Sequence, residues 1–396
     1  MHAQRILSLG NFFGATHFFL LIYVLAPYLA TFMPESSIGL VVSLGAVLTL
    51  SVFPFVPQIV RKYGPQQLAL AFAALEFILL LWLALGTGPI AAILLAALAC
   101  ATSPLLAYQM DLLLEATVES EQETGRIRTA FLTAGNITLI GTPLLIGLLL
   151  DGSDRYDRVF FAAALSLIPF ILLLLAKRLP RGRVPLARKV HEAWLCIFND
   201  TDLRAIAISM FILQLFYHLT LFIPLFLHTS LGIPWSQLGW VFAVSLIPFV
   251  LVEYPAGILA DTKLGDRTLL IVGFICTGIA FSLIAFVTAA TPIFIILSIL
   301  VFTRIGAALV EAMVEGHFFR RVSEEDASTV SVFRMMRPLG ALIAPLIGSL
   351  FLAVSSYAAF FIACGMLVAV GGVLAALPVR SFRPARVSVH PDVSHL

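Results

Sequence analysis

The segment Gly257-Ile-Leu-Ala-Asp261-Thr-Lys-Leu-Gly265-Asp-Arg267 is a short polar loop between two long apolar runs, at about residues 236–260 and 268–288. A helix that crosses the hydrocarbon core of a membrane needs roughly 20 mainly apolar residues, and both runs reach that length. The loop is therefore predicted to turn the chain between two membrane-spanning helices.

The same pattern of long apolar runs and short polar breaks recurs along the chain. Ten further runs lie at about residues 6–32, 37–60, 66–87, 89–115, 128–150, 158–176, 204–230, 291–318, 328–353 and 356–378. They are too long and too continuously apolar for the strands of a β-barrel, which are short and alternate in polarity. The predicted fold class is an all-α integral membrane protein with twelve transmembrane helices.

The composition agrees with this prediction and excludes other classes. Of the 396 residues, 60% are hydrophobic and only 12% are charged, whereas a soluble domain carries about 25% charged residues. A soluble enzyme, a disordered chain and a nucleic-acid-binding protein are therefore excluded. The four cysteines show no spacing typical of a disulfide framework or a metal site, and no cofactor is expected.

Lysine and arginine predict the orientation of the chain, because they are concentrated in cytoplasmic loops of membrane proteins. With the N-terminus inside, only Arg155 and Arg158 fall on the outer side. Three arginines lie within spans, and all the others lie inside. We therefore predict a multi-pass protein of an inner or plasma membrane, with both termini cytoplasmic. The first apolar run is too long for the core of a signal peptide.

The longest polar stretch, residues 177–203, separates the runs into two groups of six. The predicted parts are an N-terminal six-helix bundle (1–176), a cytoplasmic linker (177–203), a C-terminal six-helix bundle (204–378) and a cytoplasmic tail (379–396). Within the linker, Leu186, Val190, Trp194 and Ile197 recur at helical spacing. This spacing predicts an amphipathic helix on the inner membrane surface, with a plain linker as the alternative.

The two groups of spans also resemble each other in sequence, at an offset of about 200 residues. The matched positions are Gly39 with Gly239, Gly64 with Gly265, Glu115-Ala-Thr-Val-Glu119 with Glu311-Ala-Met-Val-Glu315, and Pro143 and Gly147 with Pro345 and Gly348. Their common offset indicates a duplication. Repeated halves of six helices are typical of a large class of secondary transporters, which bind their substrates between the halves near the midplane.

The loop at residues 257–267 resembles the signature loop of the major facilitator superfamily, in which glycine, any residue, leucine, alanine and aspartate precede a glycine and a basic residue. Here one extra residue stands before Gly265. The corresponding stretch of the first half has Arg61 in the place of the aspartate and Pro57 in the place of the first glycine. The resemblance, which indicates no subfamily, implies two pseudo-symmetric bundles, alternating access, a cavity lined by helices one, four, seven and ten, and function as a monomer.

The resemblance also implies a gating role for this loop. Gly257 and Gly265 would allow a close helix approach and a tight turn, and Arg267 completes the motif. Asp261 is expected to meet the positive end of span five, near Gly125, and so to latch the two halves together. The alternative is that Asp261 only caps a turn.

Further gating candidates lie near the inner ends of the spans. Gly64 would turn the loop of the first half. The expected ion pairs are Arg61 with Glu115 or Glu119, and Arg337 with Glu311 or Glu315. For Glu115, Glu119 and Glu315, close to the inner surface, a purely structural charge network is the favoured interpretation.

Charged residues at membrane depth are costly and are functional candidates by default. Arg304 and Glu311 are seven residues apart on span ten and therefore share one helix face, and Tyr108 and Asp111 lie on span four. Two interpretations stay open for Arg304: it binds an anionic group of the substrate, or it keeps a carboxylate charged until a proton displaces it. Asp111 and Glu311 are candidate proton carriers, since burial and neighbouring charges change carboxylate affinity for protons.

Polar residues on spans one and seven complete the set of candidates. Gln214 and His218 are four residues apart and share a helix face, and His17 lies within span one. A histidine in a transport cavity can exchange protons near neutral pH. The alternative, most relevant to His17, is a histidine that only forms hydrogen bonds in the core.

The prediction from these observations is a secondary active transporter that moves a small organic solute by alternating access, coupled to protons, with export slightly favoured. Its expected partners are the substrate, protons and the lipid bilayer, and no nucleic acid. A non-transporting membrane receptor or scaffold on the same fold is the alternative. An enzyme is not expected, because no catalytic constellation and no Walker-type loop is present. Many phenylalanines favour amphipathic substrates, whereas Arg304 favours organic anions.

Overall fold

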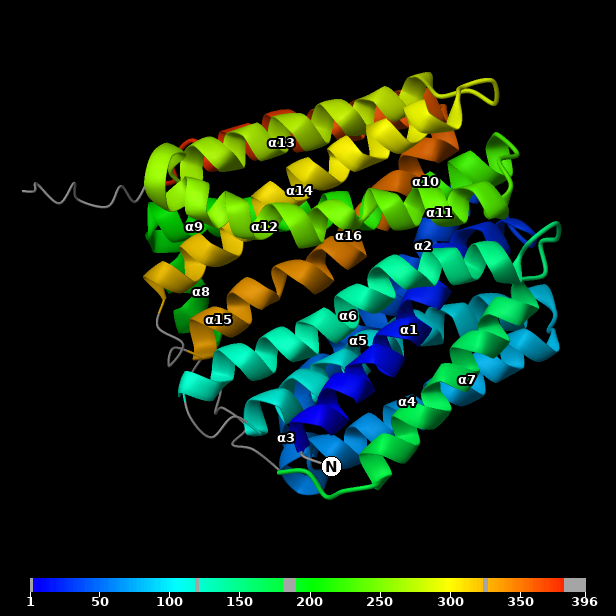
Figure 1. Cartoon of the computed structure of the whole chain (residues 1–396), viewed down its shortest axis with the longest axis horizontal. Coiled ribbons are helices and arrows are strands. Elements are labelled where there is room, and N and C mark those ends of the chain that lie inside the picture. The colour runs from blue at the N-terminus through cyan, green and yellow to red at the C-terminus, as the bar shows by residue number, and fades with distance from the viewer. Residues whose placement is uncertain (1–2, 118–120, 181–189, 323–326, 381–396) are drawn as a thin grey trace, which may run out of the picture.

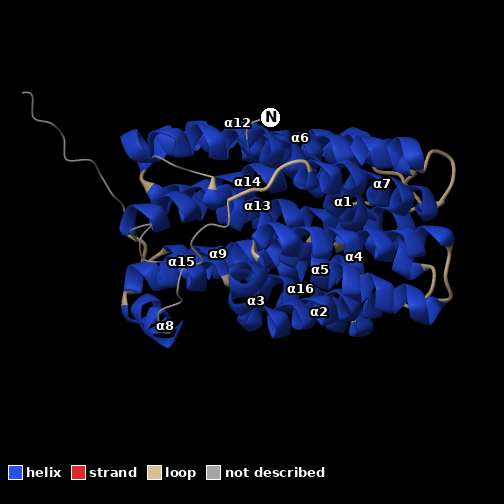
Figure 2. Ribbon diagram, turned by 90° about the horizontal axis from the view of Figure 1, so that it is seen from below, coloured by secondary structure: helices blue, strands red, loops and turns tan. Residues whose placement is uncertain are grey.

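The computed structural model describes residues 3–117, 121–180, 190–322 and 327–380. Helices make up most of the described residues, and no strand occurs among them (Figure 2). Twelve helical segments are long and apolar enough to cross a membrane. These findings confirm the predicted fold class and number of spans.

The helices of the N-terminal half follow one another with short connections. They are α1 (Ala3–Ala30), α2 (Glu35–Val52), α3 (Val56–Tyr63), α4 (Pro65–Leu85), α5 (Pro89–Ala116), α6 (Glu121–Leu149) and α7 (Tyr156–Leu175). A 3₁₀ turn, Phe53–Phe55, joins α2 to α3. The linker then contains α8 (Val190–Asn199), on which Trp194 stacks against Phe198. Leu186, the first residue of the predicted amphipathic stripe, lies outside the described residues.

The C-terminal half repeats the pattern with more interruptions. It contains α9 (Thr201–Leu219), α10 (Phe222–Pro224), α11 (Trp235–Ser245), α12 (Ile247–Leu259), α13 (Asp266–Leu283), α14 (Ile293–Arg321), α15 (Ala327–Arg334), α16 (Met336–Val354), α17 (Tyr357–Met366) and α18 (Gly372–Ala376). Three π-helical stretches, Leu225–Ser230, Ala260–Leu264 and Leu367–Gly371, lie within its spans. Such stretches leave the regular hydrogen-bond ladder and often mark functional positions.

Figure 1 shows the two halves as two groups of long helices, blue to green for the N-terminal half and green to red for the C-terminal half. Helices α8 and α15 lie at one end of the molecule, which we call the linker end. The opposite end, with the loops at 31–34, 150–155 and 231–234, is the far end. At the linker end, the side-chain amide of Gln66 donates to the carbonyl oxygen of Lys177 (2.8 Å) and so fastens the start of the linker to α4.

Equivalent glycines turn the chain in the two halves. Gly64 ends α3 with a φ of 85°, and Gly265 ends the π-helical stretch before α13 with a φ of 76°. Residues with a Cβ rarely adopt this left-handed region. The duplication recognised in the sequence therefore corresponds to the same sharp turn before the third span of each half.

The halves meet through small residues toward the far end. The backbone N–H of Gly39 in α2 donates to Oγ of Ser349 in α16, at 2.7 Å. A Cβ added to Gly239 in α11 would lie 2.6 Å from the carbonyl oxygen of Pro143 and 2.9 Å from Cα of Gly147, both in α6. Only glycine allows so close an approach. Matched repeat positions thus form the two equivalent contacts between the halves.

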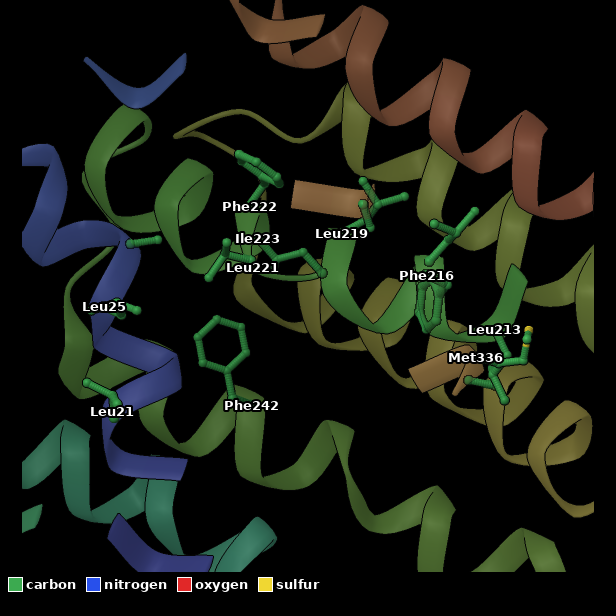
Figure 3. Close-up of a cluster of buried hydrophobic side chains, with 14 of the residues drawn as sticks. Leu21, Leu25, Leu213, Phe216, Leu219, Leu221, Phe222, Ile223, Phe242 and Met336 are labelled. Carbon is green, nitrogen blue, oxygen red and sulfur yellow. The ribbon is translucent and has the colours of Figure 1, made fainter. Parts of the chain in front are cut away.

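Apolar side chains fill the space between α1 and the C-terminal half. Figure 3 shows Leu21 and Leu25 of α1 near Leu221, Ile223 and Phe242 of the other half. All five side chains are buried and belong to one continuous core. The far end is therefore sealed by packing as well as by polar contacts.

Candidate functional site

Arg304 lies deep within α14 and has few polar partners. Its side chain is only 9% exposed, and its Nε atom has no hydrogen-bond partner. Its Cζ atom lies 5.6 Å from the centre of the Phe216 ring in α9. Tyr23 of α1 and Tyr217 of α9 interact with it electrostatically. We call Arg304, Phe216, Tyr217 and Tyr23 the aromatic–arginine cluster; both halves of the molecule contribute to it.

A second cluster shares Tyr217 with the first and is centred on Glu311, about two helix turns from Arg304 toward the linker end. The hydroxyl of Tyr217 donates to Oε2 of Glu311 at 2.6 Å. Nη2 of Arg337 in α16 lies 3.1 Å from Oε1 of Glu315, and the Arg337 guanidinium also acts electrostatically on Glu311 and Asp111. We call Tyr217, Glu311, Glu315 and Arg337 the carboxylate cluster. Of the two expected partners of Arg337, Glu315 makes the direct ion pair, while Glu311 bonds to Tyr217.

The candidates on span four lie at the edge of this arrangement. Asp111 and Glu115 are exposed on α5, and Asp111 is close enough to Arg337 to interact with it across the halves. Tyr108 is half-buried, and its ring packs against Phe53 with 5.0 Å between centres. The structure therefore brings Asp111 toward the carboxylate cluster and leaves Tyr108 in a local aromatic contact.

The histidine and glutamine candidates separate into two places. In α9, Nδ1 of His218 lies 2.8 Å from the carbonyl oxygen of Gln214, and Nε2 of Gln214 lies 3.7 Å from Sδ of Met210. His17 is buried in α1, and neither of its ring nitrogens has a side-chain hydrogen-bond partner. Gln214 and His218 thus share one helix face as expected, while His17 is held by the core.

The gating candidates of the C-terminal loop differ in part from expectation. Asp261 is 67% exposed, and its Oδ1 lies 3.6 Å from Nη1 of Arg320, in the same half. Its expected partner, the start of span five near Gly125, lies where the structure describes no side chains. A Cβ on Gly257 would meet no atom within 4 Å, so the close approach expected there is absent. Arg267 is exposed beside the turn at Gly265.

The loop of the first half makes a turn but no latch. Gly64 has the positive φ expected of it. Arg61 is exposed and forms no ion pair with another residue in the described ranges. Of its expected partners, Glu119 lies outside the described residues. The predicted pairing of Arg61 with Glu115 is therefore replaced by a solvent-facing cation at the end of α3.

A buried network of charged residues surrounds His317 and was not predicted from the sequence. The side chain of His317 in α14 is fully buried. Its Nδ1 lies 2.7 Å from Oδ2 of Asp266, and its Nε2 lies 2.9 Å from Oδ2 of Asp202. Arg320 pairs with Asp266 at 2.6 Å, and Arg321 pairs with Asp202 at 3.1 Å. We call these five residues the histidine–aspartate network.

This network fastens the linker end of the C-terminal half. It joins the starts of α9 and α13 to the end of α14, and the backbone N–H of Arg380 donates to Oδ1 of Asp202 at 2.8 Å. Asp200 caps α9 beside it, accepting from the N–H groups of Asp202 and Leu203. Burial opposes ionisation of Asp200, but these donors and the Arg321 guanidinium lower the pKa of its carboxyl. Each charge lies at a helix end, where sequence alone does not distinguish a buried position from an exposed one.

Twelve spanning helices in two repeated halves, with a buried cation between them, define the class: the chain has the fold of a polytopic membrane transporter. Residues 206–394 match the family model described as Major Facilitator Superfamily. The C-terminal half thus matches the model of that superfamily in sequence. The resemblance seen in the loop at residues 257–267 is confirmed.

Solved structures extend the similarity over nearly the whole chain. A mutant of the nucleoside transporter NupG is 17% identical, with a TM-score of 0.75, over 95% of this chain and 98% of that one. A bacterial homologue of the human lysosomal transporter Spinster, in an inward-facing and unoccupied conformation, is 14% identical, with a TM-score of 0.76, over 97% and 98%. No curated protein matches the sequence.

Proposed function

We propose that the protein is a secondary active transporter that moves a small organic solute by alternating access and couples this movement to protons. The fold and the neighbouring transporter structures support the transport function. The finer parts of the proposal, which are coupling, direction and site, rest on the two clusters between the halves. The sequence favours export, and both gradient directions therefore belong in the test.

The contacts between the halves support alternating access. Cross-half hydrogen bonds between described residues link Gly39 with Ser349, Ser43 with Leu342, Glu35 with Tyr357, and Asp154 with His228. All four lie toward the far end. Together with the predicted orientation, this arrangement corresponds to an outer side that is closed. Contacts through small residues can separate when the halves rock, because they bury few side chains.

The observation that carries proton coupling is the half-buried carboxylate of Glu311, which accepts a hydrogen bond from Tyr217 at 2.6 Å. An ionised carboxylate only accepts hydrogen bonds, whereas a protonated one also donates. Proton binding to Glu311 would therefore change its bond to Tyr217 and its attraction to Arg337. Tyr217 also borders Arg304, so the proton and the solute act on connected groups.

The test uses the purified protein in liposomes that contain a trapped pH dye. A panel of sugars, amphipathic cations and organic anions is added under inward and outward gradients. We expect compound-dependent proton movement that is lost in Glu311→Gln and reduced in Asp111→Asn. The matched control is Asp157→Asn, which removes an exposed carboxylate at the far end that pairs with Arg155.

The same experiment separates the alternatives. Proton movement that survives both Glu311→Gln and Asp111→Asn would contradict the assigned proton carriers while keeping the transporter. Solute uptake without proton movement would contradict coupling. No movement of any compound would favour the non-transporting receptor or scaffold.

A further inference from the structure

We propose that the aromatic–arginine cluster binds the anionic group of the transported solute, so that the substrate class is a small organic monoanion with an apolar or aromatic body. This inference rests on the proposed function, since it names the substrate of that same site. It selects one of the two interpretations of Arg304 that the sequence left open.

Arg304 carries a buried positive charge. A guanidinium keeps its charge in proteins and has five N–H donors. Here Nε has no partner, and no carboxylate of the described residues lies within ion-pair distance of the guanidinium. A buried charge is costly unless it is paired and hydrogen-bonded. Among the described residues, the face of Phe216 and the phenols of Tyr23 and Tyr217 lie near the guanidinium. An anionic ligand would supply the missing acceptors.

The neighbouring glutamates are not partners of Arg304, because each is held by another side chain. Oε2 of Glu311 is held by Tyr217 at 2.6 Å. Glu315 is held by Arg337 at 3.1 Å. The electrostatic partners of Arg304 are the phenols of Tyr23 and Tyr217. Arg337 is thus paired with a glutamate, whereas Arg304 has no carboxylate partner among the described residues.

The side chains around Arg304 are aromatic, which bears on the part of the solute that carries no charge. Around Arg304, Tyr23 packs against Phe242 with 5.6 Å between ring centres, and Tyr217 packs against Phe249 at 6.0 Å. Tyr23 and Tyr217 are half-buried rather than enclosed. Aromatic walls of this kind favour apolar and aromatic groups. A carboxylate attached to such a group matches both the cation and the rings.

Both halves of the molecule contribute side chains to the aromatic–arginine cluster. Tyr23 belongs to the N-terminal half, whereas Arg304 and Phe216 belong to the C-terminal half. A ligand that contacts residues of both halves binds differently when the halves rock, and a ligand shifts an equilibrium only by such a difference in affinity. The position of the cluster therefore suits a transported solute better than a purely structural cation.

The test measures binding at equilibrium, without any gradient. Purified protein in detergent is titrated with phenylacetate, phenethyl alcohol and phenethylamine, which share a ring and differ in charge, and the shift in melting temperature is recorded. We expect phenylacetate to stabilise the wild type, and the other two compounds to bind it no better than they bind Arg304→Gln. Arg304→Gln should weaken phenylacetate binding roughly 10- to 100-fold, as expected for a lost charge-assisted hydrogen bond.

Two further variants keep the inference falsifiable. Arg304→Lys keeps the charge but loses the planar fork, so intermediate affinity is expected. Arg155→Gln removes an exposed arginine and should bind phenylacetate like the wild type. If Arg304→Gln does not fold, the comparison of the three compounds on the wild type and on Arg304→Lys decides.

The inference is overturned if Arg304→Gln binds phenylacetate as tightly as the wild type, if phenethylamine binds better than phenylacetate, or if neither phenylacetate, hexanoate nor benzenesulfonate binds. Its failure is distinct from failure of the proposed function. Proton movement driven by a cation or a sugar, without anion binding, would sustain transport and reject the anion. Arg304-dependent anion binding without any solute or proton flux would support the anion site and contradict transport.

Discussion

Asp154 and His228 join the two halves across the far end of the molecule, with 2.9 Å between Oδ1 of Asp154 and Nε2 of His228. Nδ1 of the same ring lies 2.9 Å from the carbonyl oxygen of Ile233. The ring of His228 also packs on the ring of Trp235, with 4.9 Å between the ring centres. One side chain of the C-terminal half thus holds Asp154, Ile233 and Trp235 together at the far end.

His228→Ala should loosen the far end. We expect Asp154 to lose its cross-half partner and the closed population to fall. Distances between spin labels on the loops at 31–34 and 231–234 would measure this. Asp157→Asn, which changes a neighbouring pair within one half, is the control. An unchanged distance distribution in His228→Ala would show that packing alone keeps the end closed.

Gly239→Ala should destabilise the closed arrangement, because its Cβ would lie 2.6 Å from the carbonyl oxygen of Pro143. Overpacking of this kind typically costs about 1–3 kcal/mol. Gly141→Ala is the matched control, since a Cβ there meets no atom within 4 Å. Thermal unfolding in detergent would compare the two variants. Equal melting temperatures of Gly239→Ala and Gly141→Ala would contradict the close packing of α11 on α6 at Gly239.

His317→Ala should be strongly destabilising, since it leaves Asp202 and Asp266 facing each other without the imidazolium between them. Removing one partner of a buried ionic network costs about 3–5 kcal/mol. Asp200→Ala removes the cap of α9 and a partly exposed ion pair with Arg321, and should cost only about 1–2 kcal/mol. Unfolding free energies of both variants would test this order. A smaller loss for His317→Ala than for Asp200→Ala would contradict a clamping role.

Tyr217→Phe should slow proton-coupled transport roughly 10- to 100-fold, as expected when one hydrogen bond to a charged group is removed. The ring stays in place, so phenylacetate binding should change less than flux. Liposome flux and equilibrium binding would be compared in the same preparation. Tyr254→Phe, on an exposed tyrosine of α12, is the control. Equal proton flux in Tyr217→Phe and Tyr254→Phe would contradict a role of Tyr217 in proton coupling.

The fold could be predicted from sequence because length and polarity decide it. Runs of about 20 apolar residues have one stable solution in a bilayer, the helix. The repeat was also visible, and two of its matched glycines, Gly39 and Gly239, lie where helices of the two halves approach closely. The pairing of Arg337 with Glu315 followed from their places on adjacent spans.

The rest depended on contacts that no local pattern reveals. His228 and Asp154 are 74 residues apart and lie in different halves. His317 looks like an ordinary residue near the end of a helix, yet two aspartates from other helices enclose it. The expected latch of Asp261 depends on how the two halves are oriented relative to each other, which no local sequence pattern specifies.

The contacts of Gly39 with α16 and of Gly239 with α6 are the same contact made twice. In each, the second helix of one half meets the fifth helix of the other. This reciprocity is the rule of an isologous interface between identical subunits. A six-helix ancestor carrying one such glycine would already have paired with a second copy of itself. Joined in one chain, the two copies would be free to diverge, and a charge such as Arg304 could then arise in one half alone.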